Sequence, residues 1–128
     1  MQFDSANKPS GINRVVLAFK NSQRAFNWLA KNEAAFKQEL FLLALSLIII
    51  SIWQIGIYEK AMLLISVLFV IFAEVVNTAI EATIDRVGLE IHPLSGLAKD
   101  LGSAAVLIAL LISSFVWISV FISYIGYF

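Results

Sequence analysis

Residues 101–128, the last segment of the chain, carry no charged side chain. A transmembrane helix needs about 20 consecutive apolar residues. This segment is therefore long enough to cross a bilayer, with its C-terminal aromatic residues in the outer interface. Residues 40–57 are also free of charge, and residues 61–84 form a further apolar stretch. Because 60% of the residues are hydrophobic and the mean hydropathy is +0.88, we expect an integral membrane protein.

A more polar region precedes these stretches. Residues 1–10 have the composition of a tail, and residues 11–37 place apolar residues at helical spacing opposite a basic face that includes Lys20, Arg24 and Lys31. This pattern is typical of an amphipathic helix that lies in the membrane interface. The sequence thus predicts an all-α membrane protein with a single domain, residues 1–128. Its parts would be an interfacial helix at 11–37 and transmembrane helices at 40–57, 61–84 and 101–126.

Basic residues are distributed unequally around the three apolar stretches. The N-terminal region and the 85–100 connection contain eight of the Lys and Arg residues, whereas the connection at 59–60, interpreted as a very short turn, contains only Lys60. Basic loops favour the cytoplasmic side. We therefore expect a cytoplasmic N-terminus and a C-terminus on the far side. The chain has no cysteine, which excludes disulfides, thiolate metal sites and a catalytic thiol.

Three carboxylates and an amide follow one another at the end of the second apolar stretch. At about 100° per residue, Asn77, Glu81 and Asp85 fall within roughly 80° of one another and of Glu74. An ionisable group at membrane depth costs at least a few kcal/mol and indicates a functional site by default. This face should therefore point toward a protein interior or a wet cavity. The alternative is structural, since buried polar side chains also hold helices together.

Two further polar blocks, 32–39 and 98–105, lead into the other apolar stretches on the same side of the membrane. Glu33 and Glu81 could chelate a hard divalent cation that keeps phosphate oxygens in its shell. Lys99 could neutralise a phosphate, and Glu74, about one turn inside the apolar layer, could accept a hydroxyl proton. These parts suit phosphoryl transfer. The chain contains no Walker P-loop and no Rossmann or protein-kinase glycine loop.

Three sequence blocks resemble the signature of the prokaryotic diacylglycerol kinases: NEAAFKQE at 32–39, EVVNTAIEA with DRVG within 74–88, and AKDLGSAAV at 98–106. The resemblance covers roughly residues 11–119 in the family's order and spacing. It implies a homotrimeric lipid kinase of the bacterial inner membrane, with three spans and a surface helix per protomer and with active sites shared between subunits. Such an enzyme phosphorylates diacylglycerol with ATP and Mg²⁺ at the cytoplasmic face. A nucleic-acid partner is not expected.

The resemblance also implies roles for individual residues. Glu74 would be the general base on the lipid hydroxyl and Asn77 would support it, while Glu33 and Glu81 would hold the metal that bridges the ATP phosphates. The nucleotide-binding residues would be Arg14, Glu33, Glu81, Glu90, His92, Lys99 and Asp100. The substrate-binding residues would be Arg14, Glu39, Glu74 and Ser103. The surface helix keeps Ser22 but departs from the family at Asn21 and Gln23, where its better known members have aromatic residues, so no role is transferred to Asn21.

Several alternative functions stay open at this point. An undecaprenol kinase of the same family is the nearest, although the DRVG and GSAA blocks look more like the diacylglycerol branch. A small proton-coupled transporter subunit would need Glu74 near the middle of the bilayer. A non-catalytic assembly subunit would tolerate Glu74→Gln without a phenotype. For single residues, Glu33 alone could be solvated at the interface, and the pair at 99–100 could simply begin a helix.

Overall fold

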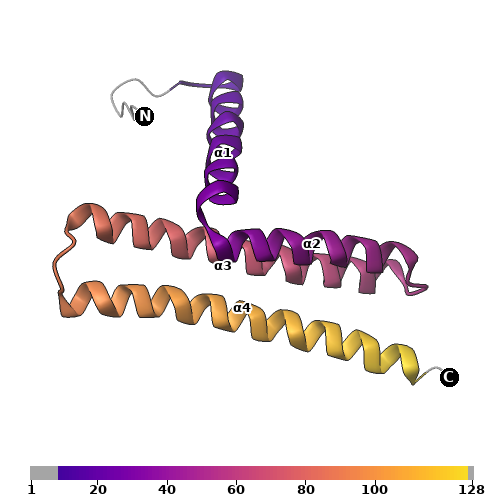
Figure 1. The fold of residues 1–128 in the computed structure, drawn as a ribbon. Coiled ribbons are helices and arrows are strands. Elements are labelled where there is room, and N and C mark those ends of the chain that lie inside the picture. The colour runs from indigo at the N-terminus through magenta and orange to yellow at the C-terminus, as the bar shows by residue number, and fades with distance from the viewer. Residues whose placement is uncertain (1–8, 127–128) are drawn as a thin grey trace. The chain divides into compact units, whose positions relative to one another are not determined.

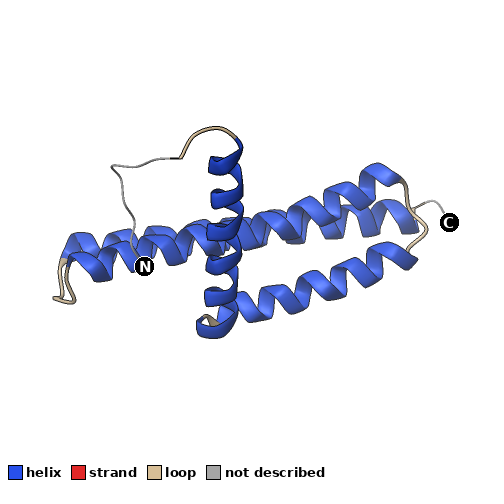
Figure 2. Ribbon diagram, turned by 90° about the horizontal axis from the view of Figure 1, so that it is seen from above, coloured by secondary structure: helices blue, strands red, loops and turns tan. Residues whose placement is uncertain are grey.

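The structure, a computed structural model, describes residues 9–126. The predicted tail up to residue 8 and the aromatic residues 127–128 lie outside this part of the chain. All the described elements are α-helices: α1 (Ile12–Asn32), α2 (Ala34–Ile52), α3 (Ile57–Val87) and α4 (Pro93–Ile125) (Figures 1 and 2). Three of them, α2, α3 and α4, are long and apolar enough to cross a membrane. The predicted all-helical fold with three candidate spans is confirmed.

The helices begin and end at different residues from those predicted. The first helix ends at Asn32 rather than at residue 37, because Glu33 leaves helical geometry with φ −104° and ψ 118°. The last helix begins at Pro93, well before residue 101. Proline is favoured in the first turn, where its missing N–H costs nothing, and Nδ1 of His92 accepts a hydrogen bond of 3.2 Å from the Leu94 N–H.

The turn predicted at 59–60 is wrong. The chain leaves the helix between Ile52 and Ile57, so that Glu59 and Lys60 lie in the first turn of α3. The Lys60 N–H donates to the carbonyl of Gly56 at 3.1 Å, which is the first hydrogen bond of this helix. Charged residues in an apolar sequence suggested a connection. An acidic residue is nevertheless favourable at a helix N-terminus, where the dipole is positive.

The chain up to Lys37 forms one compact unit. Within it, the rings of Phe26 in α1 and Phe36 in α2 stack with centroids 6.2 Å apart and planes at 14°. The side-chain amide of Asn32 donates to the Trp28 carbonyl at 2.8 Å, and the Glu33 N–H donates to the Leu29 carbonyl at the same distance. The two hydrogen bonds close the last turn of α1. The interfacial position of α1 stays a prediction.

The second unit begins at Gln38 and contains the remainder of α2 with α3 and α4. Helices α3 and α4 are antiparallel neighbours joined by a short loop (Figure 1). Val70 and Ala73 of α3 pack with Ala109 of α4, which is fully buried. A second cluster further from the loop contains Ile50, Leu63 and Val120. Small residues such as alanine let membrane helices approach closely, and here they bring the two long helices together.

Candidate active site

The buried face of α3 changes from apolar to polar along the helix. Leu63, Val67 and Val70 are buried, and the same face continues with Glu74 and Asn77, which are only 7% and 8% exposed. Steps of three and four residues keep side chains on one face of a helix. The apolar core stripe therefore runs directly into a buried carboxylate and a buried amide at the end of α3 that approaches the loop.

The amide of Asn77 is held at one end only. Its Nδ2 donates to Oε1 of Glu81, one turn further along α3, at 3.3 Å. Its Oδ1 is buried and accepts a hydrogen bond from no donor within residues 9–126. Buried polar atoms are nearly always paired, so each exception in a folded protein requires an explanation. This acceptor faces Gly102 of α4.

An ion pair connects the ends of α3 and α4. Nζ of Lys99 lies 2.7 Å from Oδ1 of Asp85, and the two side chains are 42% and 49% exposed. The charge of Glu81 also acts on Lys99. An ion pair this exposed contributes only about 0–1 kcal/mol. A phosphate can therefore compete with Asp85 for the ammonium group.

A groove of about 260 Å³ lies where the loop joins α3 to α4. Asp85 and Lys99 line it together with Glu90 and His92 of the loop, so three of the predicted nucleotide-binding residues share one groove. His92 also caps α4 through Nδ1, as described above. Two other predicted residues, Asp100 and Ser103, are exposed on α4 and are not among the lining residues.

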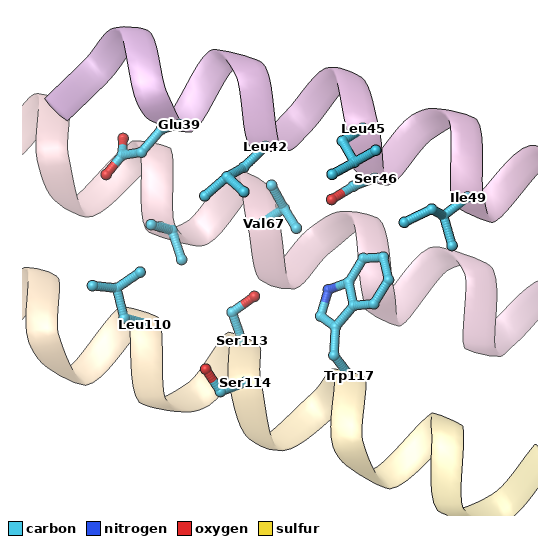
Figure 3. Close-up of a pocket in the computed structure, with 11 residues that line it drawn as sticks. Glu39, Leu42, Leu45, Ser46, Ile49, Val67, Leu110, Ser113, Ser114 and Trp117 are labelled. Carbon is cyan, nitrogen blue, oxygen red and sulfur yellow. The ribbon is translucent and has the colours of Figure 1, made fainter. Parts of the chain in front are cut away.

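A cavity of about 330 Å³ is lined by residues of α2, α3 and α4 (Figure 3). Glu39 lies at one end of it and is only 8% exposed, and its Oε2 is buried without a hydrogen-bond donor in the described part of the chain. The charges of Glu39 and Glu74 interact, so α2 brings a second carboxylate to the buried one on α3. The remaining lining residues are mainly apolar, with three serines and an indole: Leu42, Leu45, Ser46, Ile49, Val67, Val70, Leu110, Ser113, Ser114 and Trp117.

Two predicted site residues belong to the first unit. Arg14 lies in the first turn of α1, where its backbone N–H donates to the Gly11 carbonyl at 3.1 Å. Glu33 occupies the break between α1 and α2 and is half-buried. A carboxylate at such a break lies at a helix end, not within a regular helix. The pairing of Glu33 with Glu81 stays a prediction.

The donor set is compatible with a divalent cation that also binds phosphate. Within residues 9–126, no three His, Asp or Glu side chains gather into a ready-made metal cage. Magnesium that accompanies a nucleotide usually takes one or two carboxylates together with phosphate oxygens and water. Glu81, half-buried and held by the Asn77 amide, offers a hard oxygen ligand of this kind.

Two residues of this region had no assigned role in the sequence analysis. Asp85 was placed on the polar face, but its ion pair with Lys99 joins different helices and depends on their register. Gly102 appears there only as part of the GSAA block, a stretch of small residues. Such small-residue stretches are a general signal of close approach, and the structure adds which side chain lies opposite.

The chain is similar to known proteins over most of its length. The prokaryotic diacylglycerol kinase family matches the chain over residues 20–121. Diacylglycerol kinase of Escherichia coli strain K12 is 39% identical over 121 residues, which cover 94% of this chain and 99% of that protein. The Haemophilus influenzae diacylglycerol kinase is 38% identical over 110 residues, with 86% and 93% covered. That of Pseudomonas aeruginosa is 36% identical over 111 residues, with 87% and 90% covered. The chain therefore belongs to the prokaryotic diacylglycerol kinase family of membrane enzymes.

Proposed function

We propose that this protein transfers the γ-phosphoryl group of ATP to the free hydroxyl of diacylglycerol and thereby makes phosphatidic acid. The observation that carries the proposal is the buried Glu74 on the same face of α3 as Asn77 and Glu81. This supports a general base beside a carboxylate, Glu81, that would hold the metal ion of MgATP. The naming of the relatives as diacylglycerol kinases supports the choice of lipid.

In the proposed reaction, Glu74 accepts the proton of the lipid hydroxyl as its oxygen attacks the γ-phosphorus of ATP. The bond from the γ-phosphorus to the bridging oxygen breaks, and ADP leaves. Burial of Glu74 supports this role because water is kept from the carboxylate. Asn77 supports the base by holding Glu81, one turn further along the same helix.

The groove near the loop is our proposed nucleotide site. Lys99 would neutralise a phosphate after leaving Asp85, and Glu90 and His92 would bind the nucleotide from within the groove. Asp100 and Arg14, which do not line the groove, would also bind the nucleotide. Glu33 and Glu81 would hold Mg²⁺. When bound, this ion neutralises charge on the phosphates, which is the main requirement of phosphoryl transfer. The half-exposed ion pair of Lys99 supports this role, because little energy is needed to break it.

The cavity beside Glu39 supports a lipid substrate. It is open to the outside of the helices and is mostly apolar, while its polar end lies at Glu39, close to Glu74. An acyl chain in such a cavity would bring the lipid's hydroxyl end toward the base. Ser103 and Arg14 would contribute to binding the polar part of the lipid.

We also propose that the protein works as a homotrimer in the bacterial inner membrane, with its N-terminus in the cytoplasm. The unequal distribution of basic residues supports this orientation. Single cysteines introduced near Arg86 and near Ser123 would test it, because the natural chain has none. An impermeant thiol reagent applied to intact cells should label only the cysteine near Ser123.

Cross-linking in native membranes followed by electrophoresis would test the trimer.

The first experiment measures transfer of labelled γ-phosphate from MgATP in detergent micelles. Diacylglycerol and undecaprenol are supplied separately, and wild type is compared with Glu74→Gln. Labelled phosphatidic acid from wild type and none from the variant would support both the reaction and the base. Preference for undecaprenol would change the lipid but retain the mechanism. No transfer to either lipid by folded protein would contradict the proposal and favour a transporter subunit.

A further inference from the structure

Gly102 of α4 lies opposite the amide of Asn77. The role proposed for this glycine rests on the proposed function. We propose that Gly102 of α4 is a positioning residue: the space left by its missing side chain receives the Asn77 amide and directs that amide toward Glu81. Gly102 itself would touch neither ATP nor lipid. It would act through Asn77 on the orientation of a metal-binding carboxylate.

The backbone conformation gives no reason for a glycine at this position. Gly102 lies within α4, and among the described residues only Gly11 has a positive φ. Inside a helix, glycine is less favourable than alanine because it loses more conformational freedom on folding. The reason for Gly102 must therefore be its surroundings.

Those surroundings are the side chain of Asn77. A Cβ built on Gly102 would overlap Oδ1 of Asn77 and would stand only 3.3 Å from its Cγ. The hydrogen that this Cβ would replace thus points at the amide oxygen. Weak Cα–H···O contacts of this kind recur where helices approach closely. This contact faces the same Oδ1 that lacks a conventional donor in the described chain.

The contact with Gly102 determines which way the amide faces. With Oδ1 against the glycine, Nδ2 is turned toward Glu81 and donates to Oε1 at 3.3 Å. That hydrogen bond is already at the long end of the usual range, so a small rotation of the amide would break it. A side chain at residue 102 would force such a rotation. Glu81 would then lose the partner that orients it.

The kinetic test compares wild type with Gly102→Ala, Asn77→Ala and the double variant in detergent micelles. Loss of a group that orients a metal ligand typically weakens metal binding by about 10–100-fold. We expect Gly102→Ala to raise the half-saturating Mg²⁺ concentration by about tenfold or more and to leave the KM for diacylglycerol unchanged. Adding Gly102→Ala to Asn77→Ala should cause no further loss. Unchanged Mg²⁺ dependence, or an equal loss in both backgrounds, would overturn the proposal.

A melting-temperature cycle tests the same contact without relying on activity. We expect Gly102→Ala to lower the melting temperature in the wild-type background, but not in the Asn77→Ala background. Gly96→Ala is the matched control, because Gly96 lies on the same helix and a Cβ added there would meet nothing within 4 Å. It should leave melting unchanged or raise it. Since Gly96 borders the nucleotide groove, it serves as a control for stability only.

The two measurements separate this proposal from the proposed function. If wild type transfers no phosphate, the function is wrong, and the melting cycle alone decides whether Gly102 accommodates Asn77. If wild type is active but Gly102→Ala changes the melting temperature by the same amount in the wild-type and Asn77→Ala backgrounds, the function stands and the role of Gly102 is refuted.

Discussion

The two ends of the α3–α4 pair are built differently although they belong to the same two helices. At the end far from the loop, Leu63 is fully buried and packs with Ile50 and Val120. At the end near the loop, the same face of α3 carries Glu74 and Asn77. One end fills its interior with apolar side chains, whereas the other encloses polar groups that are not all satisfied.

This difference separates stability from function along a single helix. Apolar contacts need no partner beyond close packing, so the far end can be fully satisfied within the chain. A buried acceptor without a donor costs free energy comparable to a lost hydrogen bond. Within residues 9–126, Asn77 Oδ1 is such an acceptor at the near end, and Glu39 Oε2 of α2 is another. Such a cost is expected where a site awaits a ligand. The comparison therefore predicts opposite effects of mutations at the two ends.

The largest expected effect is that of Glu74→Gln. General-base catalysis contributes about 10²–10⁴-fold, and we expect kcat to fall by that amount. Melting temperature should stay the same or rise, since a neutral amide is less costly to bury than a carboxylate. Phosphate transfer and thermal unfolding in the same detergent would measure both quantities. If Glu74→Gln is inactive only because its melting temperature is much lower, Glu74 contributes to stability, and the polar end no longer differs from the apolar end.

Leu63→Ala should show the reverse pattern at the apolar end. Removing a fully buried leucine leaves a cavity and costs about 2–5 kcal/mol of unfolding free energy. The activity of the protein that remains folded should be close to wild type, because Leu63 is distant along α3 from Glu74. Unfolding by SDS in mixed micelles measures the first quantity, and specific activity at low SDS measures the second. A large loss of kcat without loss of stability would contradict this expectation.

Lys99→Met should weaken ATP binding at the polar end. A hydrogen bond to a charged group is worth about 1.5–3 kcal/mol, which corresponds to a rise in KM for ATP of roughly 10–100-fold. The KM for diacylglycerol should not change. Asp85→Asn is the matched control for stability, because it removes the same ion pair but retains the Lys99 ammonium group. It should alter unfolding free energy by no more than about 1 kcal/mol. Equal KM values for ATP in wild type and Lys99→Met would exclude Lys99 from the nucleotide site.

The smallest expected effect belongs to the serine pair between the two ends. The hydroxyls of Ser66 and Ser113 lie 3.1 Å apart and join α3 to α4. Hydrogen bonds between membrane helices contribute about 0.6 kcal/mol on average. Ser66→Ala and Ser113→Ala should each cost about that amount, and the double variant should cost no more than either one. SDS unfolding of all three variants measures this coupling. Additive losses would show that the two hydroxyls act separately.

Apolar runs in the sequence predicted the number and order of the helices, but not where each one begins. Hydropathy detects the part of a helix that lipid can cover. It does not detect the polar turns that extend α3 to Val87 and start α4 at Pro93. The error at 59–60 has the same cause. Two adjacent charged residues in an apolar sequence indicate a connection, whereas the helix dipole favours Glu59 in a first turn.

The candidate site was predictable only where its residues share one helix. Glu74, Asn77 and Glu81 follow from helical spacing alone, so their common face was visible in the sequence. The ion pair of Asp85 with Lys99 depends on how two helices are aligned. Spacing within one helix contains no information about that alignment. The proximity of Glu39 to Glu74 was likewise not available from the sequence.

The sequence by itself thus determined an all-helical membrane protein, its three long apolar helices and one polar face on the second of them. These features depend on composition and on the 3.6-residue period, which are properties of the chain. The tertiary structure decided which groups interact across helices: the Lys99–Asp85 pair, the Asn77 amide against Gly102, and the charges of Glu39 and Glu74, which act on each other. Such contacts depend on register and close approach, and these exist only when helices pack together.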